Sequence, residues 1–224
     1  MNKLFELLTE FEFVRTNIPI SRPLVVHAVP GAGKTTLLRK FLNTCSSAEV
    51  ITSGVGDKPN LLGKRIVHGN QFSIEGSFRI FDEYITSELI PDCEALFSDP
   101  IQNNKEGLPA HYIKKKSLRV PKAICDWLQT LGFEIESEVE GELSFQNFFG
   151  PDPVGKIVAF ETNVLELLRR HNCDFSLPCE IRGLEFNTVT LFTERDCSVL
   201  SGFELYIAAT RARKKLIVRT ADAN

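Results

Sequence analysis

Apolar runs of strand length alternate with amphipathic segments along the first half of the chain. Residues 23–29 (PLVVHAV) form one such run, and residues 35–43 (TTLLRKFLN) carry apolar positions at helical spacing. Further short apolar runs predict strands over 50–52, 78–81 and 95–97. Since strands that alternate with helices are typical of parallel sheets, the pattern predicts an α/β fold.

A polar segment at residues 103–110 (NNKEGLPA), followed by lysines at 114–116, interrupts this pattern. We place a domain boundary there, with one domain over 1–107 and a second over 108–224. Residues 134–142 contain five glutamates and predict a solvated strand or loop. The alternation resumes in the second domain, with helices expected over 123–131, 164–171 and 203–211 and strands over 157–160, 188–192 and 216–218.

The composition is that of a soluble globular protein. The 224 residues are 43% hydrophobic and 25% charged, with a formal net charge of −3, which suffices for one large or two compact domains. Without an overall basic character, nucleic-acid binding would need a local stripe of Lys and Arg. No apolar run approaches the ~18 residues of a membrane span, and the mixed charges of residues 1–17 do not fit a signal peptide. We expect a soluble protein without an intrinsic membrane span.

Residues 28–35 (AVPGAGKT) fit the P-loop pattern G-x-x-x-x-G-K-[ST], with alanine in place of the first glycine. Gly31 and Gly33 allow the backbone to curl so that successive N–H groups point at phosphate oxygens. Lys34 supplies a charge for the β- and γ-phosphates, and the Thr35 hydroxyl is a magnesium ligand. We predict that ATP or another nucleoside triphosphate is bound by Ala28, Val29, Pro30, Gly31, Ala32, Gly33, Lys34, Thr35 and Thr36.

An acidic pair, Asp82 and Glu83, follows the apolar run at 78–81. The carboxyl ends of neighbouring parallel strands share one edge of a sheet, so this pair is expected beside the P-loop. Asp82 is then a second magnesium ligand after Thr35, and Glu83 polarises the attacking water. The two motifs together predict hydrolysis of a nucleoside triphosphate with Mg²⁺.

Later segments distinguish among P-loop enzymes. A predicted strand leads into SDPIQ at 98–102, where the amide of Gln102 can hydrogen-bond the γ-phosphate or its water. The segment SLRVP contains Arg119, GLEF occupies 183–186, and YIAATRAR places Arg211 at a predicted helix end. In this order the motifs resemble the motor core of viral superfamily 1 helicases, in the alphavirus-like branch.

The closer resemblance is to the triple gene block protein 1 family, the movement proteins of potexviruses, carlaviruses and related plant viruses. It rests on VVHAVPGAGKTT, VITSGVGDKPNLLGKRI, FDEY, LFSDPIQ, RGLEF and ATRARKKLIV. Membership implies two RecA-like lobes with parallel sheets, the first carrying motifs I, Ia, II and III and the second motifs IV to VI. Ser98 stands where motif III usually has glycine, and Arg182 stands where motif V often has glutamine.

The resemblance implies an RNA-stimulated ATPase and RNA helicase that moves viral RNA between cells and suppresses host RNA silencing. Its implied partners are single-stranded viral RNA, the viral coat protein, the small membrane-bound movement proteins and further copies of the chain. The implied location is the host cytoplasm, with plasmodesmata or inclusions as further places. Arg119 and Arg211 would come from the second lobe to stabilise the charge of the γ-phosphoryl transition state.

Two groups of residues are candidates for RNA contact. Lys115 and Lys116 belong to a basic group near the domain boundary, and single-stranded nucleic acid binds positive grooves with stacking aromatics. Such a group fits an ordinary solvated surface equally well. By the resemblance, Thr52 and Ser53 correspond to motif Ia, which touches RNA.

Two other functions fit parts of the pattern. The chain could be an RNA- and partner-binding movement and silencing-suppressor protein in which ATP hydrolysis is incidental. A small-molecule kinase would share the P-loop, but SDPIQ and TRAR stand where a kinase needs a lid and an acceptor site. Movement that survives the loss of hydrolysis would favour the first alternative, and phosphate transfer to an acceptor nucleotide the second.

Overall fold

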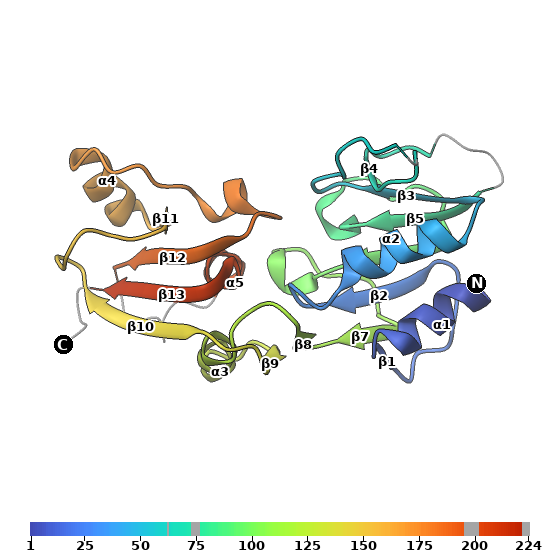
Figure 1. The fold of residues 1–224 in the computed structure, drawn as a ribbon, viewed down its shortest axis with the longest axis horizontal. Helices are drawn as coiled ribbons and strands as arrows, with labels where there is room; N and C mark the ends of the chain where they lie inside the picture. The colour runs from blue at the N-terminus through green and yellow to red at the C-terminus, as the bar shows by residue number, and fades with distance from the viewer. Residues whose placement is uncertain (62, 73–76, 195–201, 221–224) are drawn as a thin grey trace. The chain divides into compact units, whose positions relative to one another are not determined.

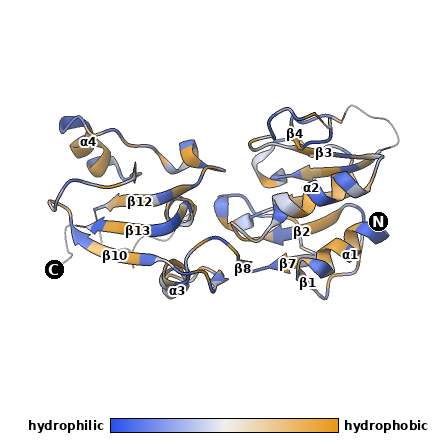
Figure 2. Cartoon of the chain, viewed as in Figure 1, coloured by the Kyte–Doolittle hydropathy of each residue, from blue (hydrophilic) through white to orange (hydrophobic). Residues whose placement is uncertain are grey.

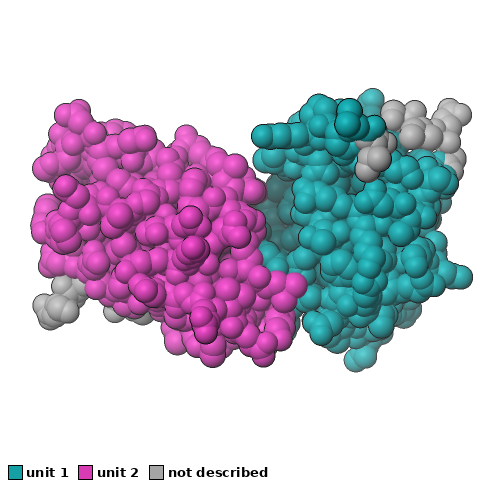
Figure 3. All heavy atoms as spheres, viewed as in Figure 1, with its two compact units in different colours: residues 1–115 teal, residues 116–224 magenta. Residues whose placement is uncertain are grey.

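The chain divides into two compact units, Met1–Lys115 (unit 1) and Lys116–Asn224 (unit 2), drawn in teal and magenta in Figure 3. This division follows residue 115, whereas the sequence pattern placed a boundary after residue 107. The later position arises because Tyr112–Lys114 forms a strand that pairs with the P-loop strand inside unit 1. The structure, a computed structural model, describes all residues except 62, 73–76, 195–201 and 221–224.

Unit 1 is built around a sheet whose seven described strands follow the order β1-β7-β2-β6-β5-β3-β4 (Figure 1). Neighbouring strands are parallel except β1 and β7, which are antiparallel. The strands are β1 (Val14–Arg15), β2 (Leu24–Ala28), β3 (Ala48–Thr52), β4 (Val67–His68), β5 (Phe78–Asp82), β6 (Ala95–Ser98) and β7 (Tyr112–Lys114). The helices are α1 (Asn2–Glu10) and α2 (Lys34–Thr44), with 3₁₀ turns η1 (Tyr84–Thr86) and η2 (Pro100–Gln102).

The central strands of unit 1 are short apolar runs because side chains on both of their faces are buried. β6 is buried along its whole length, and β2 is buried at all but one position. Parallel strands of this kind read as continuous apolar segments rather than alternating ones. Leu4 and Leu7 of α1 and Leu37 and Leu38 of α2 are also buried, each contributing roughly 1.5–3 kcal/mol through the hydrophobic effect.

Unit 2 contains a smaller parallel sheet in the order β10-β13-β12-β11 and a separate pair, β8 and β9. Hydrophobic residues run through the middle of β12 and β13 (Figure 2), which are the two central strands. The strands are β8 (Lys116–Ser117), β9 (Glu136–Ser137), β10 (Glu142–Asn147), β11 (Lys156–Val158), β12 (Phe186–Thr193) and β13 (Ala212–Thr220). The helices are α3 (Lys122–Thr130), α4 (Thr162–Arg170) and α5 (Phe203–Thr210), with a 3₁₀ turn η3 (Pro178–Ile181).

The predicted α/β fold with parallel sheets is confirmed. Helix α1, whose buried side chains are leucines, has no counterpart among the predicted elements, and further differences concern polar elements. The segment 134–142 supplies β9 and the first residue of β10, so its remainder is loop. The edge strand β10 has no apolar run because its residues are all exposed or half-buried. β13 begins at Ala212, four positions before the predicted strand 216–218, because the basic residues at its start pair with β12. In the described part of the chain, no helix has the length and apolar character that crossing a membrane requires.

Candidate active site

The P-loop connects the end of β2 to the start of α2. Gly31 and Gly33 have left-handed backbone conformations, with φ angles of 75° and 96°, which glycine adopts without steric cost. Gly33 immediately precedes Lys34, so the loop closes directly onto the first turn of the helix. The predicted nucleotide-binding residues 28–36 therefore lie at a helix N-terminus, where N–H groups and the helix dipole favour phosphate.

The Lys34 side chain is buried and turns back over this loop. Only 9% of the residue is exposed. Its Nζ donates a hydrogen bond to the carbonyl oxygen of Ala28 at 2.9 Å and lies 3.8 Å from Oε1 of Glu83. A buried ammonium group requires such partners. The structure thus brings the P-loop lysine and the predicted base together.

The candidate residues of unit 1 come from neighbouring strands that end at one edge of the sheet. β6 lies between β2 and β5, with His27 in register with Ser98 and Asp82 in register with Phe97. Asp82 is also in register with Thr52 at the end of β3. Since these four strands are parallel, their carboxyl ends meet at one edge, which is where such sheets bind ligands.

Asp82 is the residue best suited to hold a metal ion. It is 6% exposed, and its Oδ1 has no hydrogen-bond partner among the described residues. Burial, together with the charge of Glu83, raises the pKa of Asp82 to about 7. A buried carboxylate oxygen of this kind fits Mg²⁺, which prefers oxygen ligands. Asp82 and Thr35, in the first turn of α2, are the residues that would hold the magnesium of a nucleotide.

Replacing Asp82 with asparagine is expected to stabilise the protein against unfolding in the absence of magnesium, more at pH 8 than at pH 5. An aspartate with a folded pKa of about 7 and an ordinary value of 3.8 makes the protein lose stability as pH rises between those values. The amide has no such dependence, so the gain from Asp82→Asn should be on the order of 2 kcal/mol larger at pH 8 than at pH 5. Denaturant unfolding in EDTA measures it. The exposed Asp152 provides the control Asp152→Asn, and an equal gain at both pH values would contradict a raised pKa.

Glu83 follows Asp82 in an uncommon backbone conformation. Its φ angle of 55° is left-handed, which is rare for residues other than glycine. Its carbonyl oxygen accepts hydrogen bonds from the hydroxyls of Ser53 at 2.6 Å and Thr86 at 2.7 Å. Its carboxylate lies near Lys34 and accepts a long 3.5 Å hydrogen bond from the hydroxyl of Ser98. Backbone strain held in place by such contacts is common at functional sites.

Asp99 lies in the same site, although sequence reasoning did not select it. It is fully buried; its Oδ2 accepts a hydrogen bond from Nε2 of Gln102 at 2.8 Å and its Oδ1 from the N–H of Ile101 at 3.1 Å. Burial raises the pKa of Asp99 to about 6, and the charge of Lys34 acts in the opposite direction. The predicted γ-phosphate sensor Gln102 is therefore held in place by Asp99. The position of Asp99 in the SDPIQ segment, three residues before Gln102, is the sequence signal that could have identified it.

The predicted RNA-contacting pair of motif Ia lies beside the acidic residues. Thr52 is 2% exposed, and its hydroxyl oxygen accepts a hydrogen bond from the N–H of Gly54 at 3.0 Å. The N–H of Ser53 donates to the carbonyl oxygen of Asp82 at 3.2 Å, and its hydroxyl donates to that of Glu83. Ser53 thus supports the acidic pair, whereas the Thr52 hydroxyl bonds to Gly54, and the contact of both residues with RNA stays a prediction.

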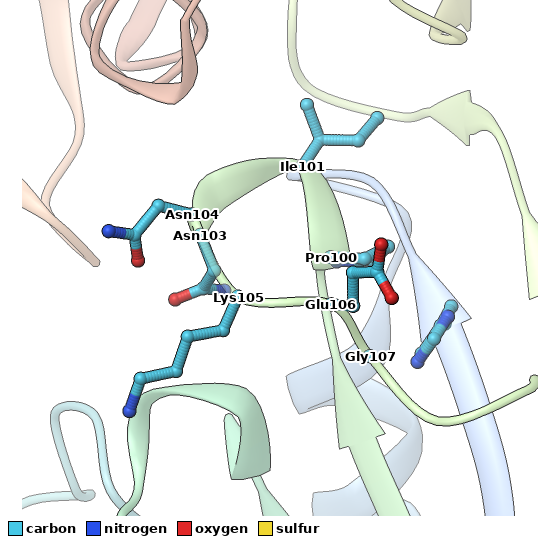
Figure 4. Close-up of a pocket in the computed structure, with 8 residues that line it drawn as sticks. Pro100, Ile101, Asn103, Asn104, Lys105, Glu106 and Gly107 are labelled. Atoms are coloured by element: carbon cyan, nitrogen blue, oxygen red, sulfur yellow. The ribbon is translucent and has the colours of Figure 1, made fainter.

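A cavity of about 480 Å³ lies at the same edge of the unit 1 sheet. Asn104 and Lys105 extend to the same side of its loop in Figure 4. The cavity is lined by the imidazole of His27 from β2 and by the segment that follows β6. The lining residues are His27, Pro100, Ile101, Asn103, Asn104, Lys105, Glu106 and Gly107. The hollow therefore has a mixed polar and apolar lining and includes Pro100 and Ile101 of the SDPIQ segment.

In unit 2, the side chains of both predicted arginines contact Thr210, and Arg119 also pairs with the carboxylate of Glu185. Arg119 donates from Nη1 to Oε1 of Glu185 at 2.5 Å and from Nη2 to the carbonyl oxygen of Thr210 at 3.3 Å. Arg211 follows Thr210, is 3% exposed, and donates from Nη2 to the Thr210 hydroxyl at 3.0 Å. Nε of Arg213 lies 3.8 Å from Glu185. Sequence reasoning noted the GLEF segment but did not select its glutamate, which orients Arg119.

The two predicted RNA-binding lysines fall on either side of the division between the units. Lys115 is exposed at the end of unit 1. Lys116 begins unit 2 in β8 and forms an ion pair with Glu138 at 2.8 Å. Their role in RNA binding stays a prediction.

Comparison with known protein families matches residues 24–220 to the viral superfamily 1 RNA helicase core domain. The movement and silencing protein TGBp1 of Apple stem pitting virus (isolate PA66) is 38% identical over 220 residues, covering 97% of this chain and 99% of the relative. TGBp1 of Poplar mosaic virus (isolate ATCC Pv275) is 35% identical over 229 residues, covering 100% and 98%. TGBp1 of Potato virus X (strain HB) is 35% identical over 224 residues, covering 98% and 99%.

Among solved structures, the chain is similar in fold to viral helicases. The complex of arterivirus nonstructural protein 10 (helicase) with DNA matches with a TM-score of 0.60 and 17% identity, over 88% of this chain and 60% of that chain. The PRRSV helicase matches with a TM-score of 0.53 and 15% identity, over 98% and 50%. The chain thus spans between half and three-fifths of these helicases. The likeness confirms the predicted fold class.

Proposed function

The chain belongs to the viral superfamily 1 RNA helicase family, as a relative of the movement and silencing proteins TGBp1, and from this premise we propose that it is an RNA-stimulated ATPase and RNA helicase. One observation carries the proposal: Lys34, Glu83 and the buried Asp82, with its unpartnered oxygen, meet at the carboxyl edge of one sheet. This combination suits the hydrolysis of a nucleoside triphosphate better than binding alone.

Each of these residues has a defined part in the proposed hydrolysis. Lys34 leaves its contact with Ala28 to bind the β- and γ-phosphates, which the N–H groups of the loop also contact. Asp82 and Thr35 would hold Mg²⁺, which would supply positive charge against the charge that develops on the phosphate oxygens. Glu83 orients the attacking water and accepts its proton.

The remaining residues adjust this chemistry to the nucleotide and the RNA. Gln102, fixed by Asp99, hydrogen-bonds the γ-phosphate or the attacking water. We assign to Arg119 and Arg211 the stabilisation of transition-state charge, which an arginine does without losing its proton. The residues proposed to contact single-stranded RNA are Thr52, Ser53, Lys115 and Lys116.

The biological role that we propose follows the name of the TGBp1 relatives, movement and silencing protein. The chain would move viral RNA between host cells and suppress RNA silencing, acting in the cytoplasm and at plasmodesmata or inclusions. Its proposed protein partners are the viral coat protein, the small membrane-bound movement proteins and further copies of itself.

Single-stranded RNA is expected to raise the rate of ATP hydrolysis by the purified chain severalfold. A motor that moves on RNA releases its products faster when RNA is bound, because product release or a conformational step commonly limits turnover. The measurement is phosphate release with Mg²⁺, with and without a single-stranded RNA, and with a duplex of the same sequence as a control. Hydrolysis that is indifferent to RNA would contradict the motor.

The second candidate is an RNA- and partner-binding protein in which hydrolysis is incidental. The name of the TGBp1 relatives favours it, because movement and silencing describe no hydrolysis. The two candidates differ in whether movement and silencing suppression need the phosphate chemistry, which a P-loop variant tests.

A further inference from the structure

The side chain of Tyr84 extends from the turn that follows Glu83 into the interior of unit 1. The residue is 3% exposed and packs in a core cluster with Val25, Ile51 and Leu96. Its hydroxyl oxygen accepts a hydrogen bond from the N–H of Leu108 at 2.7 Å and lies 2.9 Å from Nε2 of His27. A single hydroxyl therefore joins three segments that are far apart in the sequence.

The segment before Leu108 approaches these two rings closely. A Cβ atom added to Gly107 would lie 2.9 Å from Cε1 of His27 and 3.0 Å from the hydroxyl oxygen of Tyr84. Only glycine leaves room for this approach. Gly107 and His27 also line the cavity at the sheet edge, so Tyr84 holds the cavity wall to the strands behind it.

The Tyr84 hydroxyl can make both of these hydrogen bonds at once. Its oxygen accepts from Leu108 and keeps a second lone pair, and its proton remains free to be donated. Burial and the charge of Lys34 lower the pKa of His27 to about 4, so the imidazole is neutral near pH 7. Nε2 of a neutral imidazole either donates or accepts, and the phenol is a suitable partner for both tautomers.

Two members of this chain of hydrogen bonds, Tyr84 and His27, adjoin the candidate active site in the sequence. Tyr84 follows Glu83, whose left-handed backbone persists only if its surroundings hold it there. His27 precedes Ala28, whose carbonyl oxygen accepts from Lys34. The same contacts thus join the strained turn at Glu83 to the strand that leads into the P-loop.

We propose that Tyr84 is a positioning residue for hydrolysis, whose hydroxyl, fixed between His27 and Leu108, holds the turn that aims the carboxylate of Glu83. The inference rests on the proposed ATPase function. Loss of the hydroxyl leaves the phosphate-binding loop and Asp82 intact, so it slows the chemical step and spares nucleotide binding.

The test is the substitution Tyr84→Phe, which removes one oxygen and keeps the packed ring. We expect kcat for ATP with saturating RNA to fall about tenfold, with KM for ATP within twofold of wild type. The matched control Tyr112→Phe removes the same atom from β7 of unit 1 and is expected to leave both constants unchanged. Thermal unfolding of both variants reports whether unit 1 remains folded.

A second pair of variants tests the partner of the hydroxyl. Gln at position 27 retains a hydrogen-bond acceptor at about the reach of Nε2, and Leu does not. We expect His27→Gln to retain most of kcat and His27→Leu to lose as much as Tyr84→Phe. Equal kcat in Tyr84→Phe and wild type, or a rise in KM alone, would overturn the inference. An inactive wild type would instead refute the proposed ATPase function.

Discussion

The variant Glu83→Gln is expected to bind ATP normally and to hydrolyse it about 10²–10⁴ times more slowly than wild type. Gln has nearly the shape of Glu, so the left-handed turn and its contacts with Ser53 and Thr86 remain. The amide cannot accept a proton from the attacking water, so kcat falls, while the P-loop still binds the phosphates of ATP. Steady-state phosphate release gives kcat, and equilibrium binding of a fluorescent ATP analogue gives affinity.

The control for this variant is Glu88→Gln, which makes the same chemical change at an exposed position of unit 1. It should match wild type in both measurements. If Glu83→Gln keeps more than half of the wild-type kcat, Glu83 is not the base. Weaker ATP binding without a change in kcat would assign the carboxylate to binding.

The sequence pattern predicts the buried strands and the P-loop helix of unit 1 well. β2, α2, β5 and β6 lie close to their predicted positions because their apolar residues are buried on both faces of a sheet or along one face of a helix. β10 and the start of β13 are not predicted, because they are polar and become strands through backbone hydrogen bonds with neighbouring strands. Backbone pairing between distant segments leaves little local signal.

The active-site motifs can be recognised in the sequence for a different reason. Gly31, Gly33 and Lys34 are fixed by the chemistry of phosphate, which demands particular residues at particular spacings. His27 and Tyr84 carry no such signal, since each is an ordinary residue until the fold brings their rings together. Glu185 is a similar case, because it pairs with Arg119 only when the fold brings together two residues that are 66 positions apart in the sequence. Supporting residues of this kind emerge only from tertiary structure.

The variant Lys34→Ala is expected to lower kcat/KM for ATP by about 10²–10³, a loss typical of removing one preorganised charge from the transition state. The loss should exceed that of a simple contact, because Lys34 also compensates charge on buried acids. Its Nζ lies 3.8 Å from Glu83, and its charge lowers the pKa of both Asp82 and Asp99. Without it, these carboxyls hold protons more tightly, which weakens magnesium binding as well. Phosphate release as a function of ATP and Mg²⁺ concentration separates the two effects.

The same variant decides between the two proposed functions when it is placed in an infectious viral genome. If hydrolysis drives RNA transport, Lys34→Ala should abolish cell-to-cell movement of a fluorescent reporter virus. The control is Lys40→Ala on the same helix, where the lysine side chain is 44% exposed and pairs with Glu10. That variant should move normally, since an exposed ion pair contributes little to stability. Wild-type movement of the Lys34→Ala virus, with ATPase lost in vitro, would make hydrolysis incidental. Loss of movement with silencing suppression retained would assign the phosphate chemistry to transport alone.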